Sequence, residues 1–266
     1  MNLNIALYQF APIANSISDP VLAAHREVLH SAGTRLGLKG TILLAPEGVN
    51  AFICGPEAST QEFLALLGNT LKLSLDWKES WAPSQAFKKW LIKIKKEIIT
   101  FDDGHSKPLE GRAPAVPAKT LLKWLNQGAD DDGLPLILVD TRNDVEIAEG
   151  TFNNALDLKI GKFTDLKSRI AEPSVQAQLL GHRVVTFCTG GIRCEKAAIF
   201  MQHHGMENVV QLEGGILRYF EEVGGAHWHG GCFVFDEREN LGPDLRPMPR
   251  VLPRLSKTKN KPSATQ

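Results

Sequence analysis

The stretch RVVTFCTGGIR, residues 183–193, decides how the second half of the chain is interpreted. Residues 183–187 form a mostly apolar, β-branched run, which is typical of a buried strand. Cys188 ends this strand, and two glycines separate it from a segment with helical spacing that begins near residue 194. Ligands of open α/β sheets bind at the carboxyl ends of the strands. The stretch therefore predicts a site at Cys188.

The glycine pair indicates what this site holds. Two glycines let the backbone turn tightly, so that successive N–H groups can point at an anion, and the following helix adds its positive N-terminal end. Together with the charge of Arg193, these groups favour a thiolate or a persulfide on Cys188. A buried, inert cysteine is the alternative interpretation. We expect Cys188 to be the catalytic nucleophile, and its active-site loop to be Thr189, Gly190, Gly191, Ile192 and Arg193.

The spacing within the loop argues against one class of enzyme. A cysteine phosphatase places five residues between its cysteine and its arginine, so that the loop spans a phosphate. Here only four residues separate Cys188 from Arg193, and the next residue is Cys194. The shorter loop suits a single sulfur atom better than a tetrahedral phosphate.

Helices and strands alternate around this loop. Strands made of continuous apolar runs and separated by helices indicate a parallel sheet with helices on both faces, which we assign to residues 118–226. Residues 101–117 carry Gly, Pro and charge without periodicity and are interpreted as a linker. The expected helices lie near 118–127, 162–171, 194–204 and 215–223, and the expected strands at 135–140, 183–187 and 208–212.

Residues 1–100 show a different order, strand–helix–strand–strand–helix–strand, which is that of a ferredoxin-like α+β unit. The first helix runs to about Gly37, and its spacing puts Val21, Ala24, Val28 and Ala32 on one face. The second helix covers 57–70, and the strands are expected at 3–10, 40–45, 48–55, 71–77 and 88–99.

Residues 227–266 are interpreted as a C-terminal extension that ends in a tail. From Leu245 onward the tail is rich in proline, contains no acidic residue and is expected to be disordered. Its basic residues are Arg246, Arg250, Arg254, Lys257, Lys259 and Lys261.

Composition limits the location and the partners. Lys plus Arg and Asp plus Glu both number 30, so no overall charge favours nucleic acid, and we expect no DNA partner. No apolar run is long enough to span a membrane, and the N-terminus lacks the features of a secretion signal. We therefore expect a cytoplasmic protein whose four cysteines are thiols. The sequence leaves the oligomeric state open.

Several motifs resemble known families. Asp140-Thr-Arg142 with Glu146 and Gly150, the Cys188 loop, and Leu212-Glu-Gly-Gly215 resemble the motifs of rhodanese domains. The longer stretches CTGGIRCEKA (188–197), PEGVNA (46–51), KIKKEI (93–98) and CFVFDER (232–238) resemble the rhodanese-like tRNA uridine 5-hydroxylases. This chain departs from some members in lacking a cysteine-rich C-terminal extension, and from many rhodanese domains in having Thr151 in place of histidine.

The resemblance implies a fold, a reaction and a partner. It implies a rhodanese-fold oxidoreductase of tRNA modification that converts the wobble uridine to 5-hydroxyuridine, with molecular oxygen as co-substrate, tRNA as partner and Cys188 as the essential residue. Two alternatives stay open at this point. One is a small-molecule sulfurtransferase that acts through a cysteine persulfide on Cys188, and the other is a non-enzymatic redox or adaptor module.

The remaining candidate residues have competing interpretations. Cys194 is a possible resolving thiol, although its spacing with Ala197, Ala198 and Met201 predicts a packed helix face. Asp140, Arg142 and Glu146 are expected to form a structural cluster of charges under the loop.

Two further groups concern tRNA and metals. The exposed side of the strand near 90–95 makes Lys93, Lys95 and Lys96 the candidate contacts to tRNA phosphates. His227, His229 and Cys232 do not have the usual spacing of zinc ligands, so we expect no metal site, and no cofactor is evident.

Overall fold

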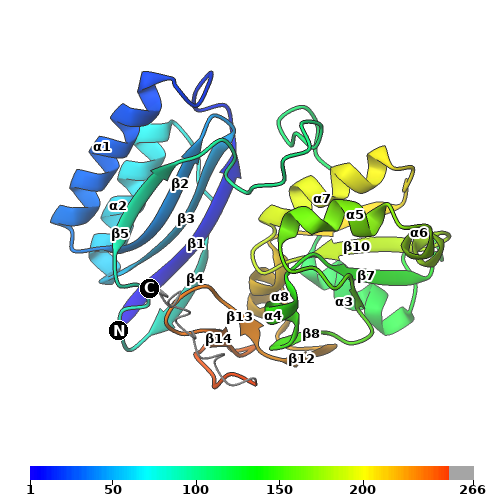
Figure 1. Cartoon of the computed structure of the whole chain (residues 1–266). Coiled ribbons are helices and arrows are strands. Elements are labelled where there is room, and N and C mark those ends of the chain that lie inside the picture. Colours follow the sequence, from blue (N-terminus) through cyan, green and yellow to red (C-terminus); the bar gives the residue numbers. More distant parts are fainter. Residues whose placement is uncertain (252–266) are drawn as a thin grey trace, which may run out of the picture.

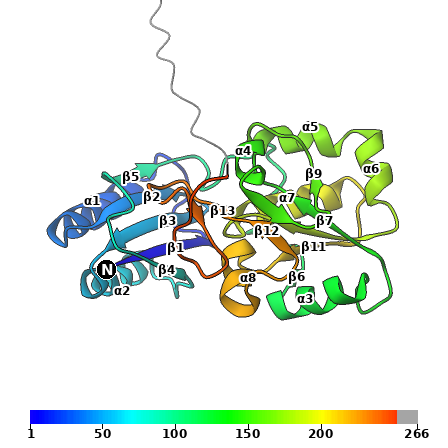
Figure 2. The same ribbon diagram turned by 90° about the horizontal axis from the view of Figure 1, so that it is seen from below.

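The computed structural model describes residues 1–251. Two α/β units lie side by side, and the chain passes from one to the other near residue 100 (Figures 1 and 2). Within the described part of the chain, no helix has the length and apolar character required to cross a membrane.

The N-terminal unit is a ferredoxin-like layer, as the sequence predicts. Its sheet has the order β4-β1-β3-β2-β5, in which β5 is an added edge strand that runs parallel to β2. Both helices cover the same face of this sheet (Figure 1). The strands are β1 (Asn2–Phe10), β2 (Lys39–Ala45), β3 (Gly48–Gly55), β4 (Lys78–Ala82) and β5 (Trp90–Ile94), and the helices are α1 (Pro20–Arg35) and α2 (Glu57–Leu71).

Three expectations for this unit are wrong in detail. The strand expected at 71–77 is absent from the structure, because Leu71 ends α2 and the strand begins only at Lys78. The strand expected at 88–99 is shorter and covers Trp90–Ile94. The buried face of α1 includes Leu22 and Leu29, and of the four residues predicted for it only Ala32 is buried, whereas Ala24 and Val28 are exposed.

The second unit contains a five-stranded parallel sheet of order β6-β11-β10-β7-β9, with β10 at its centre. One hydrophobic core lies between the sheet and α3 and α8, and another between the sheet and α5, α6 and α7, so helices cover both faces as predicted. The strands are β6 (Ala115–Val116), β7 (Leu136–Asp140), β9 (Leu156–Asp157), β10 (Arg183–Phe187) and β11 (Val209–Leu212). The helices are α3 (Ala118–Gln127), α4 (Asp144–Ile147), the 3-10 helix η1 (Phe163–Asp165), α5 (Leu166–Ile170), α6 (Pro173–Leu179), α7 (Ile192–His203) and α8 (Gly215–Val223).

The C-terminal segment returns to the second unit in two short antiparallel pairs. Strand β12 (Trp228–Gly230) pairs with β8 (Gly150–Phe152), and β13 (Cys232–Phe233) pairs with β14 (Asn240–Leu241). Ordered contacts extend further into the expected tail, because Arg250 forms an ion pair of 2.8 Å with the buried Glu149. Arg246 is also described, whereas Arg254, Lys257, Lys259 and Lys261 lie outside the described residues.

The boundaries 1–100, 101–117, 118–226 and 227–266 remain predictions. The structure nevertheless gives the expected linker a structural role at both ends. Phe101 is buried in a core of the second unit, where it stacks on Phe163 with a centroid distance of 4.7 Å. At the other end, β6 adds an edge strand to the parallel sheet.

Candidate active site

The central strand β10 delivers Cys188 to the carboxyl edge of the parallel sheet. Gly191 has a φ of 100°, in the left-handed region that favours glycine, and this turn starts α7. The backbone N–H of Gly191 donates a hydrogen bond to Cys188 Sγ at 3.1 Å. Ile192 and Arg193, expected in the loop, instead form the first turn of α7. The tight turn thus aims one backbone amide and a helix N-terminus at a single sulfur atom.

The surroundings of Cys188 favour its ionised form. Burial alone would raise the pKa of this thiol, but a hydrogen bond from the Cys194 thiol, the charge of Arg193 and the backbone N–H groups of Arg193 and Gly191 lower it to about 6. A thiol with this pKa is mostly thiolate at neutral pH, and the thiolate is the nucleophilic form.

Cys194 is packed on the helix face that the sequence predicts and also contacts Cys188. It is fully buried, together with Ala197, Ala198 and Met201 on the predicted helix face. Burial and the negative charge of Cys188 raise its pKa well above the ordinary value, so Cys194 is a thiol that donates to its neighbour. All four cysteines are free thiols in the structure. The role of Cys194 in resolving an oxidised Cys188 remains a prediction.

The charges under the loop separate into two pairs. Arg193 donates two hydrogen bonds of 2.8 Å to Glu146, whose carboxylate is fully buried. Arg142 pairs with Asp140 at 2.6 Å, and Thr151 donates to the same carboxylate at 2.8 Å. The expected cluster therefore exists as two adjacent ion pairs, of which only the Glu146 pair fixes the arginine beside the thiolate.

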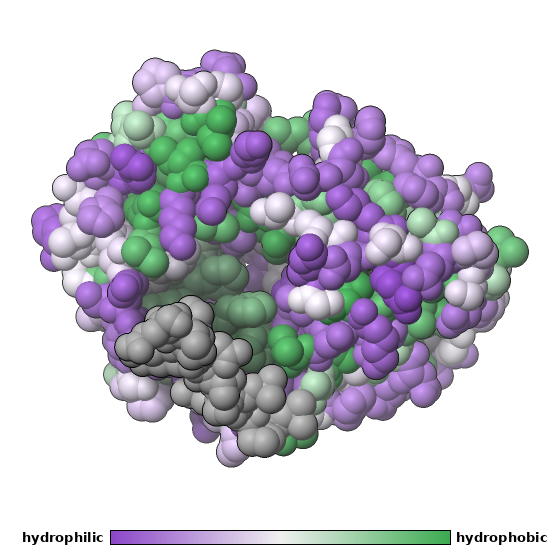
Figure 3. All heavy atoms as spheres, in the orientation of Figure 1, coloured by the Kyte–Doolittle hydropathy of each residue, from purple (hydrophilic) through white to green (hydrophobic). Residues whose placement is uncertain are grey.

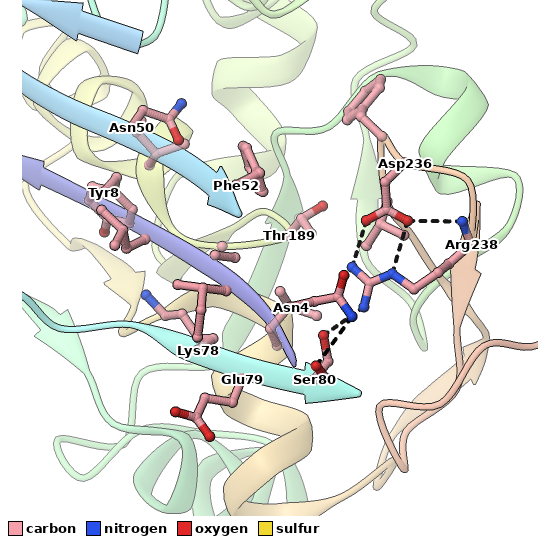
Figure 4. Close-up of a pocket in the computed structure, with 18 of the residues that line it drawn as sticks. Asn4, Tyr8, Asn50, Phe52, Lys78, Glu79, Ser80, Thr189, Asp236 and Arg238 are labelled. Atoms are coloured by element: carbon pink, nitrogen blue, oxygen red, sulfur yellow. Dashed lines mark hydrogen bonds and ion pairs between the residues drawn. The ribbon is translucent and has the colours of Figure 1, made fainter. Parts of the chain in front are cut away.

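Cys188 opens into a cavity of about 100 Å³ between the two units. Figure 3 shows the hollow between the units, with hydrophobic residues on its walls. One wall is the helix-free face of the N-terminal sheet, and its labelled residues Tyr8, Asn50, Phe52 and Lys78 are visible in Figure 4. The other walls are the loop at Thr189 and Gly190 and the segment Val234–Arg238.

The helix that follows the loop is bound tightly to the N-terminal unit. Two of its buried charged residues, Glu195 and Lys196, have partners in the N-terminal unit. Glu195 accepts hydrogen bonds from Tyr8 at 3.0 Å and from Arg112, whereas Lys196 pairs with Glu47 at 3.0 Å and with Glu97 at 2.6 Å. The stretches CTGGIRCEKA, PEGVNA and KIKKEI, which were matched separately in the sequence, thus meet at one place.

These cross-boundary pairs were not predicted from the sequence. The available signal was a pair of opposite charges at 195–196 inside an otherwise apolar helix segment. The sequence contains no comparable signal for Tyr8 and Lys78, because neither belongs to a motif that singles it out.

The three candidate lysines are exposed on or beside the edge strand β5. Residues opposite one another on neighbouring strands share a face of the sheet. Leu43 pairs with both Asn50 and Lys93, so Lys93 lies on the same face as the cavity residue Asn50. The helix-free face thus continues from the cavity toward Lys93. Contact of Lys93, Lys95 and Lys96 with tRNA remains a prediction.

The three residues considered as metal ligands do not converge. His227 bonds Asn126 at 2.8 Å, His229 bonds Asn153 at 3.3 Å, and Cys232 is buried beside Arg142. Burial raises the pKa of Cys232 to about 12. No group of three metal-binding side chains occurs among residues 1–251.

Comparison with known proteins agrees with this division into two units. Residues 3–98 match the UPF0176 acylphosphatase like domain, and residues 118–222 match the rhodanese-like domain. A protein of Variovorax paradoxus named tRNA uridine(34) hydroxylase is 52% identical over 91% of this chain and 90% of its own length. The chain belongs to the tRNA uridine(34) hydroxylase family. A second member, from Burkholderia vietnamiensis, is 48% identical over 94% of this chain and 87% of its own length.

Family membership is consistent with the presence of both units in one chain. In this hydroxylase family member, the rhodanese unit supplies the thiolate, and the acylphosphatase-like unit supplies a wall of the cavity in front of it. The site is therefore a property of the whole two-unit chain.

Proposed function

We propose that this chain hydroxylates uridine 34 of tRNA at C5 and that Cys188 is the nucleophile. The observation that carries the proposal is a cysteine thiolate at the end of a cavity whose opposite wall comes from another unit. The names of the family members supply the base and the reaction. The proposal also keeps the cytoplasmic location expected from the sequence, because the tRNA substrate is there.

The chemistry needs an activated C5 atom. Addition of the Cys188 thiolate to C6 of the uracil ring would make C5 electron-rich and reactive toward oxygen. One atom of molecular oxygen would enter the C5–H bond, and the other would leave as water. The two electrons and two protons would come from an external thiol reductant, which becomes a disulfide. A Cys188 persulfide as the reacting group is the alternative form of the same proposal.

The helix-free face of the N-terminal sheet supports RNA binding. Phe52 and Leu91 each pair with Thr41, so they lie on the face that leads to the cavity, and Phe52 has an exposed fraction of 41%. Proteins bind single-stranded RNA loops by stacking bases on such side chains and by contacting phosphates with lysines. We place the anticodon loop across this face, with the phosphates near Lys93, Lys95 and Lys96 and the target base turned into the cavity.

The first experiment is nucleoside analysis of tRNA from cells that lack the protein. Wild type should restore 5-hydroxyuridine and Cys188→Ser should not. Cys54→Ser is the matched control, because Cys54 is buried in β3 and burial raises its pKa. Full restoration by Cys188→Ser would contradict the proposal.

A second experiment separates the two forms of the chemistry. An anticodon stem–loop with 5-fluorouridine at position 34 should form a lasting covalent complex with wild type, since fluorine on C5 prevents completion of the reaction. Cys188→Ser should form none. A wild-type protein that hydroxylates but never forms the complex would favour the persulfide.

The two other functions considered from the sequence predict different results. A small-molecule sulfurtransferase would leave tRNA nucleosides unchanged in the deletion strain and would transfer sulfur from thiosulfate. A redox or adaptor module would respond to oxidant through Cys188 and Cys194, and it would not require the cavity wall from the N-terminal sheet.

A further inference from the structure

Lys78 is a buried cation that has no anionic partner. It lies on β4 with an exposed fraction of 6%, and its side-chain ammonium makes no hydrogen bond or ion pair to any residue that the structure describes. Its ammonium lies 5.2 Å from the centre of the Tyr8 ring, a contact visible in Figure 4. Buried lysines are normally paired, because removing an ammonium from water is costly. An unpaired one at a cavity wall therefore requires an explanation.

The neighbouring polar groups are already occupied. The Tyr8 hydroxyl donates to Glu195 at 3.0 Å. The two nearby carboxylates, Asp76 and Glu221, are bound by Arg218 at 3.0 and 2.8 Å. Lys78 lines both the cavity that contains Cys188 and the adjoining polar pocket at Gly214 and Arg218, and the charge of Cys188 acts on it. The free donor capacity of Lys78 thus lies at the boundary between the cavity in front of the thiolate and the adjoining pocket.

A second polar atom of the same wall also lacks a partner. The Oδ1 atom of Asn4 is buried and accepts no hydrogen bond within the described residues. Asn4 and Lys78 lie on the adjacent strands β1 and β4, where Ser80 opposes Asn4 and Ala6 opposes Lys78. A wall with an unused donor and an unused acceptor suits a ligand that offers both. A uracil ring presents two carbonyl oxygens and one N–H group.

We propose that Lys78 binds a carbonyl oxygen of the uracil ring that Cys188 attacks. This inference rests on the function proposed above and adds a substrate-binding residue from the N-terminal unit. The cavity volume of about 100 Å³ exceeds the roughly 10–15 Å³ needed for one water, and it suits a single small ring better than a whole nucleotide.

The same contact would assist the addition step. As the Cys188 lone pair forms the bond from Sγ to C6, the C5=C6 pair of electrons shifts toward C4, and negative charge develops on O4. No atom leaves in this step. An ammonium already placed at that oxygen stabilises the charge without reorganisation, as preorganised donors do in other enzymes. Lys78 would therefore serve both recognition and reactivity.

The test compares two anticodon stem–loops, one with uridine at position 34 and one with an abasic residue there. Wild type should bind the uridine form about tenfold more tightly, since the hydrogen bond involves a charged group. Lys78→Met should abolish this preference without weakening binding of the abasic form, and Lys78→Arg should restore part of it. A Lys78→Met variant with the wild-type preference would overturn the inference, as would a wild type without any preference.

Two controls separate this role from a structural one and from the proposed function. Because the Lys78 ammonium has no partner to lose, Lys78→Met should unfold at the same temperature as wild type or higher. A lower unfolding temperature would assign Lys78 to the fold and overturn the inference. If wild type shows no base preference while cells still need Cys188 for 5-hydroxyuridine, the inference about Lys78 fails and the proposed function stands.

Discussion

The two sheets of this protein differ in how many of their faces are covered. The parallel sheet of the rhodanese unit has helices on both faces, and each face carries its own hydrophobic core. The N-terminal sheet has helices on one face only, and its other face carries Asn4, Tyr8, Asn50 and Lys78 along the cavity. The covered sheet holds Cys188 at its edge. The half-covered sheet leaves one face open to the cavity.

The largest expected effect tests the difference between the two faces of the N-terminal sheet. Phe63 is fully buried on the helix side and packs against Trp90 with a centroid distance of 5.1 Å. Phe63→Ala should lower the free energy of unfolding by about 3–5 kcal/mol, because it leaves a cavity in the core. Phe52→Ala, on the open face, should change it by no more than about 0.5 kcal/mol. Denaturant unfolding measures the free energy of unfolding of both variants. Equal losses would contradict the claim that only the helix side of this sheet carries a hydrophobic core.

A smaller loss in the free energy of unfolding is expected when the ion pairs between the two units are removed. Lys196→Met removes the cation between Glu47 and Glu97 and leaves two partly buried carboxylates without it. We expect a loss of about 1–3 kcal/mol in the free energy of unfolding. Lys96→Met is the matched control, because Lys96 is exposed and its loss should cost no more than about 0.5 kcal/mol. Similar values for the two variants would mean that the buried pairs do not hold the units together.

The rate of alkylation of Cys188, at the edge of the covered parallel sheet, is expected to depend on pH. Its pKa of about 6 lies below that of a free thiol, so the thiolate fraction falls as the pH drops through 6. Alkylation of Cys188 should therefore rise about tenfold from pH 5 to pH 8 and then level off. Peptide mass spectrometry follows each cysteine separately, and Cys232, whose pKa is raised to about 12, should stay slow. A midpoint near pH 9 for Cys188 would contradict the proposed activation.

The smallest expected effect is on RNA binding at β5, the edge strand of the N-terminal sheet. Lys93→Glu combined with Lys95→Glu should weaken binding of an anticodon stem–loop and reduce the slope of log affinity against log salt by about 0.7–0.9 for each lost phosphate contact. Folding should be unaffected, because both side chains are exposed. Lys119→Glu combined with Lys162→Glu makes the same charge change on the rhodanese unit. If the control pair has an equal effect, the contribution of Lys93 and Lys95 is not local.

The rhodanese unit could be predicted closely from the sequence because its elements have strong patterns. The structure contains the strand Arg183–Phe187 and the helices Ala118–Gln127 and Gly215–Val223 at the predicted positions. The turn at Gly190–Gly191 could be anticipated as well, since glycine at this point has a stereochemical reason.

The N-terminal unit was predicted less well at β4, the strand that carries Lys78. Residues 71–77 alternate in hydrophobicity like a strand, but Leu73, Leu75 and Trp77 are a connecting segment packed against the core. The real strand, β4, has a weak pattern because it faces the cavity through Lys78. Local patterns fail where a residue serves the site instead of the core. Contacts such as Lys196 with Glu47 join residues 149 positions apart and leave no periodic trace.

The cavity wall has a consequence for how members of this family could diverge. Because Cys188 and the proposed base-binding surface belong to different units, tRNA preference could change through the N-terminal sheet while the sulfur chemistry stays constant. A chimera that exchanges this sheet between two relatives should carry the donor's tRNA preference with it. The exchanged unit would pack correctly against the rhodanese unit only if it also provided two carboxylates, equivalent to Glu47 and Glu97, that form ion pairs with Lys196.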